Sequence, residues 1–95
     1  MAETSSNRIV ITVLGKNRPG IVAGVTRVLS EAAVDIRDIT QSIIEDIFTM
    51  TLIASMDGAT MDFAALQDAL NAEGETLGVT VKTQREDVFQ FMYRL

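Results

Sequence analysis

The feature that most constrains this chain is a change of hydrophobic period across a short polar connection near its start. Residues 8–14 carry apolar and β-branched side chains on both alternating faces, which is typical of a central strand covered on both sides. Apolar residues between positions 21 and 32 then recur at helical spacing and predict an amphipathic helix of about three turns. The connection at residues 15–20 must therefore turn the chain from a strand into a helix that packs on it.

That connection has the chemistry of an anion site. Pro19 fixes its own φ, and Gly20 permits backbone angles that are closed to other residues. A helix that begins after Gly20 points unpaired N–H groups and its positive dipole end outward, beside Lys16 and Arg18. A small anion or a carboxylate fits such a place. The same residues also make an ordinary tight turn, which is the reading that local chemistry alone favours.

The next segments predict two strands joined by a short turn at residues 45–46. Within 34–44 the apolar side chains change phase near Arg37 and Asp38, which indicates a β-bulge and therefore an edge strand. Residues 47–56 have one strongly apolar face, expected to meet the helices, and one mixed face for water or another subunit.

The remaining segments predict a second helix, a fourth strand and a C-terminal helix. Asp62 or Thr60 is expected to cap the second helix and Gly74 to end it. An alternating run at 77–81 predicts the strand, and residues 84–95 carry one apolar helical face. In the first helix, Gly24 either allows close approach to the sheet or a partner, or is a tolerated surface glycine.

This order of elements predicts an α+β, ferredoxin-like βαββαβ fold, with a four-stranded antiparallel sheet and two helices on one face. We expect residues 1–7 to be a disordered N-terminus, and residues 8–95 to form a single domain that includes a C-terminal helix over 85–95. The uncovered sheet face is too apolar to remain bare, which predicts a homodimer.

Composition excludes several classes of function. The chain has no Cys and no His, which removes thiolate chemistry, Ser-His-Asp catalysis and the usual zinc ligands. A net charge of -5 opposes binding to nucleic acid or to an anionic membrane surface. No apolar run approaches the ~20 residues of a membrane span, and no secretion signal is present, so we expect a cytoplasmic protein.

Other site readings fit poorly. The acidic residues are separated and suit caps and turns, so we expect no metal and no cofactor. Gly15 and Gly20 have the outer spacing of a phosphate-binding P-loop, but the Lys-Ser/Thr pair is missing. An acylphosphatase-like enzyme would use Asn17 and Arg18 in this loop, yet its longer glycine-bearing loop ending in Phe-Arg is absent. We therefore expect no enzymatic activity.

Four short strings carry a resemblance to a known family: 15–22 (GKNRPGIV), 34–36 (VDI), 38–41 (DITQ) and 48–50 (FTM). Together they resemble an ACT domain over about residues 8–95. With the tail at 85–95, the chain resembles a family of small, stand-alone bacterial ACT-domain proteins of uncharacterised function. It is also similar to the ACT repeats of the glycine cleavage system transcriptional repressor.

The resemblance implies regulation rather than catalysis. ACT domains typically bind amino acids or other small ligands at subunit interfaces, through the first loop, the helix start and a neighbour's second strand. Carried over by position, this implies a ligand site at Asn17, Pro19, Gly20, Ile21 and Gln41. Many ACT domains have Asp at position 17; an amide oxygen still accepts from a ligand ammonium, without the charge.

Two hypotheses follow, of different classes. In the first, a homodimer senses a small molecule, an amino acid, and reports it to a regulated protein. In the second, the same fold is a ligand-free dimerisation and protein-interaction module. A titration of amino acids separates the two.

Overall fold

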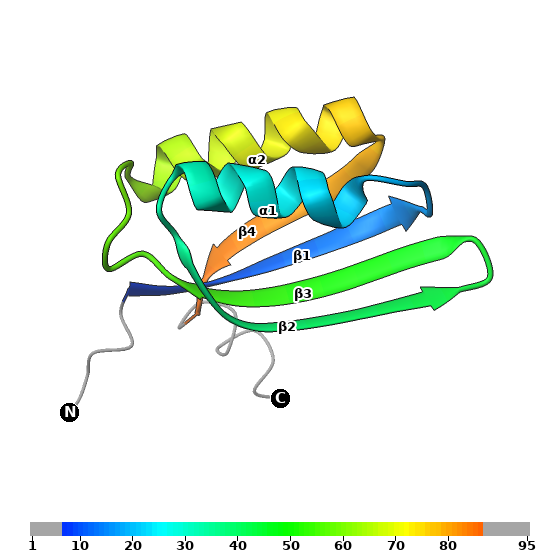
Figure 1. The fold of residues 1–95 in the computed structure, drawn as a ribbon, viewed down its shortest axis with the longest axis horizontal. Helices are drawn as coiled ribbons and strands as arrows, with labels where there is room; N and C mark the ends of the chain where they lie inside the picture. The colour runs from blue at the N-terminus through cyan, green and yellow to red at the C-terminus, as the bar shows by residue number, and fades with distance from the viewer. Residues whose placement is uncertain (1–6, 87–95) are drawn as a thin grey trace.

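A computed structural model describes residues 7–86 of the chain. Two helices lie side by side on one face of an antiparallel sheet (Figure 1). The sheet has four strands in the order β2-β3-β1-β4. This is the predicted ferredoxin-like βαββαβ arrangement, which is confirmed. The elements are β1 (Arg8–Lys16), α1 (Ile21–Glu31), β2 (Asp35–Ile44), β3 (Ile47–Ser55), α2 (Phe63–Leu77) and β4 (Val79–Arg85).

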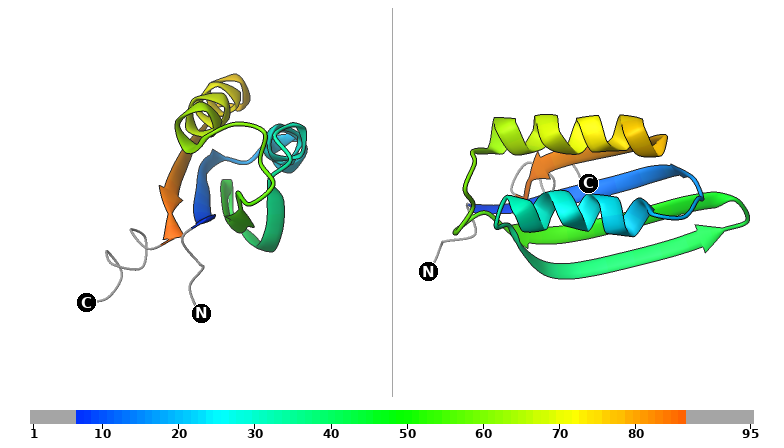
Figure 2. Two further views of the ribbon diagram at one scale, coloured as in Figure 1. Left: turned by 90° about the vertical axis from the view of Figure 1, so that its left-hand side faces the viewer. Right: turned by 45° about the horizontal axis from the view of Figure 1, so that its top comes forward.

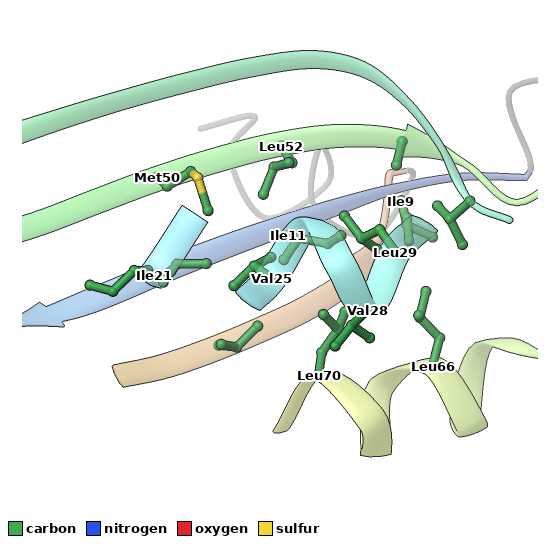
Figure 3. Packing of buried hydrophobic residues seen from close by; sticks show 14 of the residues in the cluster. Ile9, Ile11, Ile21, Val25, Val28, Leu29, Met50, Leu52, Leu66 and Leu70 are labelled. Atoms are coloured by element: carbon green, nitrogen blue, oxygen red, sulfur yellow. The ribbon is translucent and has the colours of Figure 1, made fainter. Parts of the chain in front are cut away.

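Strand β1 is the central strand that its two apolar faces predict. It pairs with β3 on one side and with β4 on the other. Ile9, Ile11 and Val13 point toward the helices and are at most 2% exposed. They meet residues of α1, α2 and β3 such as Val25, Leu70 and Leu52 in one hydrophobic core (Figure 3). Burial of this apolar surface is the main stabilising term of the fold.

Strand β2 is an edge strand with an irregular register, as the change of phase predicts. Its pairing with β3 shifts between Ile36 and Asp38, which inserts one extra residue at Arg37. Beyond the shift, every residue of the strand is exposed. The bulge therefore re-aims the side chains of β2 where neither helix covers them.

The end of α2 differs from the prediction. Asp62 caps its start, accepting a hydrogen bond of 2.9 Å from the Ala65 N–H. The prediction that Gly74 ends the helix is wrong, because the C-cap is Gly78, with a φ of 76°. Gly74 instead lets α2 lie against β4: a Cβ there would stand 2.9 Å from the Val79 carbonyl oxygen.

The end of β4 differs as well. Gln84 pairs with Val10 and Arg85 with Ile9, so both are strand residues rather than the first residues of the predicted C-terminal helix. Continued pairing along β1 satisfies their backbone groups and extends the strand. The rest of that predicted helix, residues 87–95, lies outside the described residues, as do residues 1–6.

Asn7 and Gly24 each make a close contact. Asn7, in the segment expected to be disordered, accepts a 2.9 Å hydrogen bond from the Met56 N–H. Gly24 allows close approach to α2 rather than to the sheet, because a Cβ on it would stand 2.9 Å from Leu77 Cδ1.

Among residues 7–86, no helix is long and apolar enough to cross a membrane.

Candidate functional site

The loop between β1 and α1 ends in a left-handed glycine. Gly20 is the N-cap of α1, with φ 91° and ψ -1°, and no side chain caps the helix there. The Gly20 carbonyl accepts the first helical hydrogen bond, 2.9 Å from the Gly24 N–H. An ideal Cβ at Gly20 would meet no atom within 4 Å, so the space in front of it is open. The first turn of α1 thus has N–H groups that receive no side-chain oxygen.

The loop is held in place at Asn17. The Asn17 N–H donates a 2.7 Å hydrogen bond to the carbonyl oxygen of Asp46, in the turn between β2 and β3. Asn17 itself is an exposed residue. The backbone is therefore fixed by the neighbouring hairpin while the amide remains on the surface.

Of the two cations beside the loop, Arg18 contacts the second helix. Arg18 Nη1 donates to the carbonyl oxygen of Leu77 at 3.1 Å, at the C-terminus of α2. Carbonyl groups at that end of a helix carry partial negative charge, so Arg18 stabilises the end of α2. Lys16 is the last residue of β1 and pairs with Ile47. Arg18 therefore makes a structural contact with α2, and the attraction of a ligand anion by Lys16 and Arg18 stays a prediction.

Pro19 and Ile21 flank Gly20 with opposite exposure. Pro19 is exposed in the turn. Ile21 is 1% exposed and belongs to the hydrophobic core. Only the backbone N–H of Ile21 can therefore serve a ligand, and its side chain holds the start of α1 on the sheet.

Gln41 lies apart from the loop in the pairing scheme of the sheet. It is exposed on β2 and pairs with Met50 of β3, which in turn pairs with Val13 of β1. Strand β3 therefore separates Gln41 from the strand that leads into the loop. The chain brings Asn17, Pro19, Gly20 and Ile21 together and leaves Gln41 on the sheet edge.

An open groove between α1 and β2 was not predicted from the sequence. Its volume is about 630 Å³. The small side chains of Ala23, Thr26 and Ser30 form the α1 wall, and their helical spacing is the signal that could have found it. None of the predicted ligand residues lines it. The lining residues are Ala23, Thr26, Arg27, Ser30, Val34, Asp35 and Ile36.

Arg27 is the charged residue of this groove that links the two helices. It bridges Glu73 of α2 at 2.7 Å and Glu31 of its own helix at 3.3 Å. The hydrogen bond to Glu31 and the negative charge of Glu73 raise the pKa of Arg27. The positive charge of Arg27 is thus already paired with protein carboxylates.

Within residues 7–86, no group of three or more acidic side chains could hold a metal ion.

Apolar side chains are exposed on both faces of the sheet near β2. Ile39 and Ile43 flank Gln41 on the side of the helices and are 42% and 53% exposed. On the opposite face, Ile44 is 67% and Ile47 47% exposed. The exposed surface around the β2 edge is therefore more apolar than solvent alone favours.

The ferredoxin-like fold, with a glycine-capped first helix after a central strand, defines a class of small α+β domains. Within that class the chain belongs to the ACT domain family, which it matches over residues 7–84.

Relatives of similar length share this domain. The chain is 50% identical to a UPF0237 protein of Methanosarcina acetivorans, over 96% of this chain and 99% of the relative. It is 39% identical to a UPF0237 protein of Listeria innocua, over 93% and 99%. The relatives therefore include archaeal as well as bacterial proteins, which widens the bacterial family that the sequence suggested.

Solved structures agree with the fold. An ACT domain protein from Streptococcus pneumoniae superposes with a TM-score of 0.76 and 38% identity, covering 86% of this chain and 92% of that one. A putative glycine cleavage system transcriptional repressor has a TM-score of 0.73 and 26% identity, over 82% and 44%. The second likeness spans less than half of the larger protein.

Proposed function

We propose that this chain is a regulatory module, not an enzyme, that binds an amino acid as a homodimer. The observation that carries the proposal is the left-handed Gly20, which leaves the first turn of α1 uncapped and facing open space. Backbone N–H groups at a helix N-terminus are suited to a carboxylate. The likeness to a protein described as a transcriptional repressor supports regulation as the role of the domain.

In the proposed site the protein binds the carboxylate and the ammonium of the ligand separately. Its carboxylate accepts hydrogen bonds from the backbone N–H groups of Gly20 and Ile21. Its ammonium donates to the side-chain oxygen of Asn17, whose backbone N–H is hydrogen-bonded to the Asp46 carbonyl oxygen. The exposed ring of Pro19 borders the same space. Because no side chain of Gly20 intervenes, the carboxylate can approach the backbone closely.

The edge of the sheet supports a homodimer. Residues 39–43 of β2 read Ile-Thr-Gln-Ser-Ile, which is nearly the same in both directions. Antiparallel pairing with a second copy, centred on Gln41, sets Ile39 against Ile43 and Thr40 against Ser42 of the partner. A two-fold interface needs this kind of self-complementarity. The segment has neither Pro nor Lys, the residues that usually protect an edge. Gln41 lies at the centre of this interface, and its contribution to the ligand site is part of the proposal.

The ligand site is tested by calorimetry with the standard amino acids. We expect Asn17→Ala to weaken binding by about 1–3 kcal/mol through the lost hydrogen bond to a charged group. Gly20→Val should abolish binding, because its Cβ would occupy the open space in front of the helix. Gly78→Val is the matched control, since Gly78 has a similar φ of 76° at the other end of the other helix.

Folding of each variant is checked by circular dichroism. A folded Gly20→Val protein that binds as tightly as the parent would place the site elsewhere. If no amino acid binds and the protein is nevertheless dimeric, the second hypothesis, a ligand-free interaction module, replaces the first; the exposed Ile39 and Ile43 are the observation that favours it.

The dimer is tested by single cysteines, because the chain has none of its own. Directly opposed residues of antiparallel strands have Cα atoms about 4.5–5.5 Å apart, which suits a disulfide. Gln41→Cys should therefore cross-link fastest under oxidation, Thr40→Cys more slowly, and the control Asp68→Cys on α2 not at all. A monomer by light scattering would refute the homodimer, and a maximum at another residue would refute the register.

A further inference from the structure

Within residues 7–86 both helices lie on one side of the sheet, and the other side is a second surface that no described helix covers (Figure 2). We call it the open face. The pairing registers define which residues share it, because directly opposed residues point to the same side. Its members are Thr12, Leu14 and Lys16 of β1, Asp38, Thr40, Ser42 and Ile44 of β2, Ile47, Thr49, Thr51 and Ile53 of β3, and Thr80, Lys82 and Gln84 of β4, with Val10 at one end.

Cross-strand rows make the open face regular. Lys82, Thr12, Thr51 and Thr40 stand opposite one another across all four strands. The next row contains Leu14 and Thr49 among other small or β-branched residues. Such side chains stand up from a sheet in even ridges, which interdigitate best with another sheet about 10 Å away.

Exposure along the open face is uneven. On β1 it rises from 3% at Val10 to 54% at Leu14. Leu14, Ile44 and Ile47 come from three different strands and gather at this exposed end, beside the β2–β3 turn. A partner of the open face therefore has an apolar patch at one end to bury.

The charges at the two margins of the open face are opposite. Asp38 lies on β2 at one edge of the sheet and Lys82 on β4 at the other edge. Their rows are adjacent, since Lys82 is level with Thr40 and Asp38 is two residues before it. Asp38 and Lys82 of the same copy cannot pair with each other, because β3 and β1 lie between their strands.

We infer that the open face binds the open face of a second copy of this chain. A two-fold axis parallel to the strands lays β2 of one copy over β4 of the other. Asp38 then faces the partner's Lys82 twice, and the end that carries Leu14, Ile44 and Ile47 meets the same end of the partner, with β3 of each copy over β1 of the other. An axis across the strands would set each patch on the opposite end of the partner and would bring Asp38 over the partner's β2, so it is disfavoured.

This contact uses a different surface from the edge pairing of β2 and does not depend on the ligand site. Its exposed part measures about 20 Å by about 20 Å, from strand spacing and rise. That area is less than the roughly 800 Å² per partner of a standard interface. The contact is therefore weak and concentration-dependent, and together with the β2 pairing it builds an assembly of four copies.

The test is sedimentation velocity over a range of protein concentration. Thr51→Arg places a long cation in the centre of the open face, close to its own copy across the axis, and should abolish the open-face step. Lys82→Asp and Asp38→Lys should each weaken it about tenfold, because each turns two attractive pairs repulsive. The combined variant exchanges the charges and should restore it to within about threefold of the parent.

Asp68→Lys, on α2, is the matched control, because it changes the charge by as much as Asp38→Lys does. It should leave the open-face association step unchanged. Ile43→Lys should remove the edge dimer and keep the open-face step, which separates failure of this inference from failure of the proposed dimer. The inference is overturned if the parent shows no second association step, if Thr51→Arg leaves that step intact, or if the charge exchange fails to restore it.

Discussion

The two edge strands of the sheet differ in how much of each is covered by a helix. Strand β2 has ten residues, and all but the half-buried Ile36 are exposed. Strand β4 has seven residues and alternates, with Val81 and Thr83 buried toward α2. The Gln67 side chain of α2 also donates a 3.1 Å hydrogen bond to the Thr83 carbonyl. Among the described residues, β4 is therefore packed under α2, while β2 is exposed along nearly its whole length and carries exposed isoleucines.

The difference teaches where stability and where association reside. Contacts of β4 with α2 belong to the core of a single copy, so changes there act on folding. Side chains of β2 beyond the bulge are exposed in a single copy, so substitutions there should change its stability little and act on association. Small domains bury a limited fraction of their surface, and an unfinished edge is a place where a partner adds to it.

The largest effect on stability is expected from Gly74→Val, which would disrupt the packing of α2 on the edge strand β4. A Cβ at Gly74 would stand 2.9 Å from the Val79 carbonyl oxygen and 2.9 Å from Val81 Cγ2. Backbone cannot yield as a flexible side chain can, so α2 must move away from β4. We expect the free energy of unfolding to fall by about 3 kcal/mol, measured by urea denaturation at fixed protein concentration.

Ala72→Val is the control on the same helix. Ala72 is exposed, so the change should cost only the lower helix propensity of valine, about 0.5 kcal/mol. Equal losses for the two variants would mean that close packing of α2 on β4 does not distinguish this edge.

A second prediction compares equivalent truncations on the two edges. Val81→Ala removes two methyl groups at a position that is 7% exposed and should lower the free energy of unfolding by about 2 kcal/mol. Ile43→Ala removes more atoms, but at 53% exposure it should change the stability of one copy by less than about 0.5 kcal/mol. The same Ile43→Ala should weaken the dimer in light scattering. A large loss of stability in the dilute, monomeric protein would contradict the comparison.

The sequence predicts the open edge better than the closed one, for a physical reason. The phase change around Arg37 is a local signal, and it correctly predicts a bulged edge strand. The role of Gly74 is set by packing on β4, and no local pattern distinguishes a helix-ending glycine from one that permits close approach. The true C-cap, Gly78, lies where an alternating run predicted strand, because Leu77 fits either period.

The candidate site shows the same limit. The loop and its left-handed glycine follow from Pro-Gly before a helical run. The direction of Arg18 does not, because its acceptor, the Leu77 carbonyl, is 59 residues away in the chain. The α1–β2 groove likewise needs the bulge and the helix placed together, which only the assembled fold provides.

The smallest effects separate the charges of the two edges. On β4, the Arg85 guanidinium lies 4.6 Å from the centre of the Phe63 ring of α2, a cation–π contact. On β2, Arg37 pairs with Asp35 at 2.9 Å, but the two side chains are 60% and 66% exposed. We expect Arg85→Ala to lower the free energy of unfolding by about 0.5–1 kcal/mol, and Arg37→Ala by less than about 0.5 kcal/mol, because water screens the exposed pair.

Phe63→Leu distinguishes the ring contact from loss of the arginine stem. It removes the aromatic face and retains an apolar side chain, so Arg85→Ala in that background should cost less than in the parent. Salt gives a second criterion, since 1 M sodium chloride should remove what remains of the Arg37 effect more completely than that of Arg85. If Arg37→Ala proves the more costly change in one copy, then β2 is stabilised within the chain and its edge is not reserved for a partner.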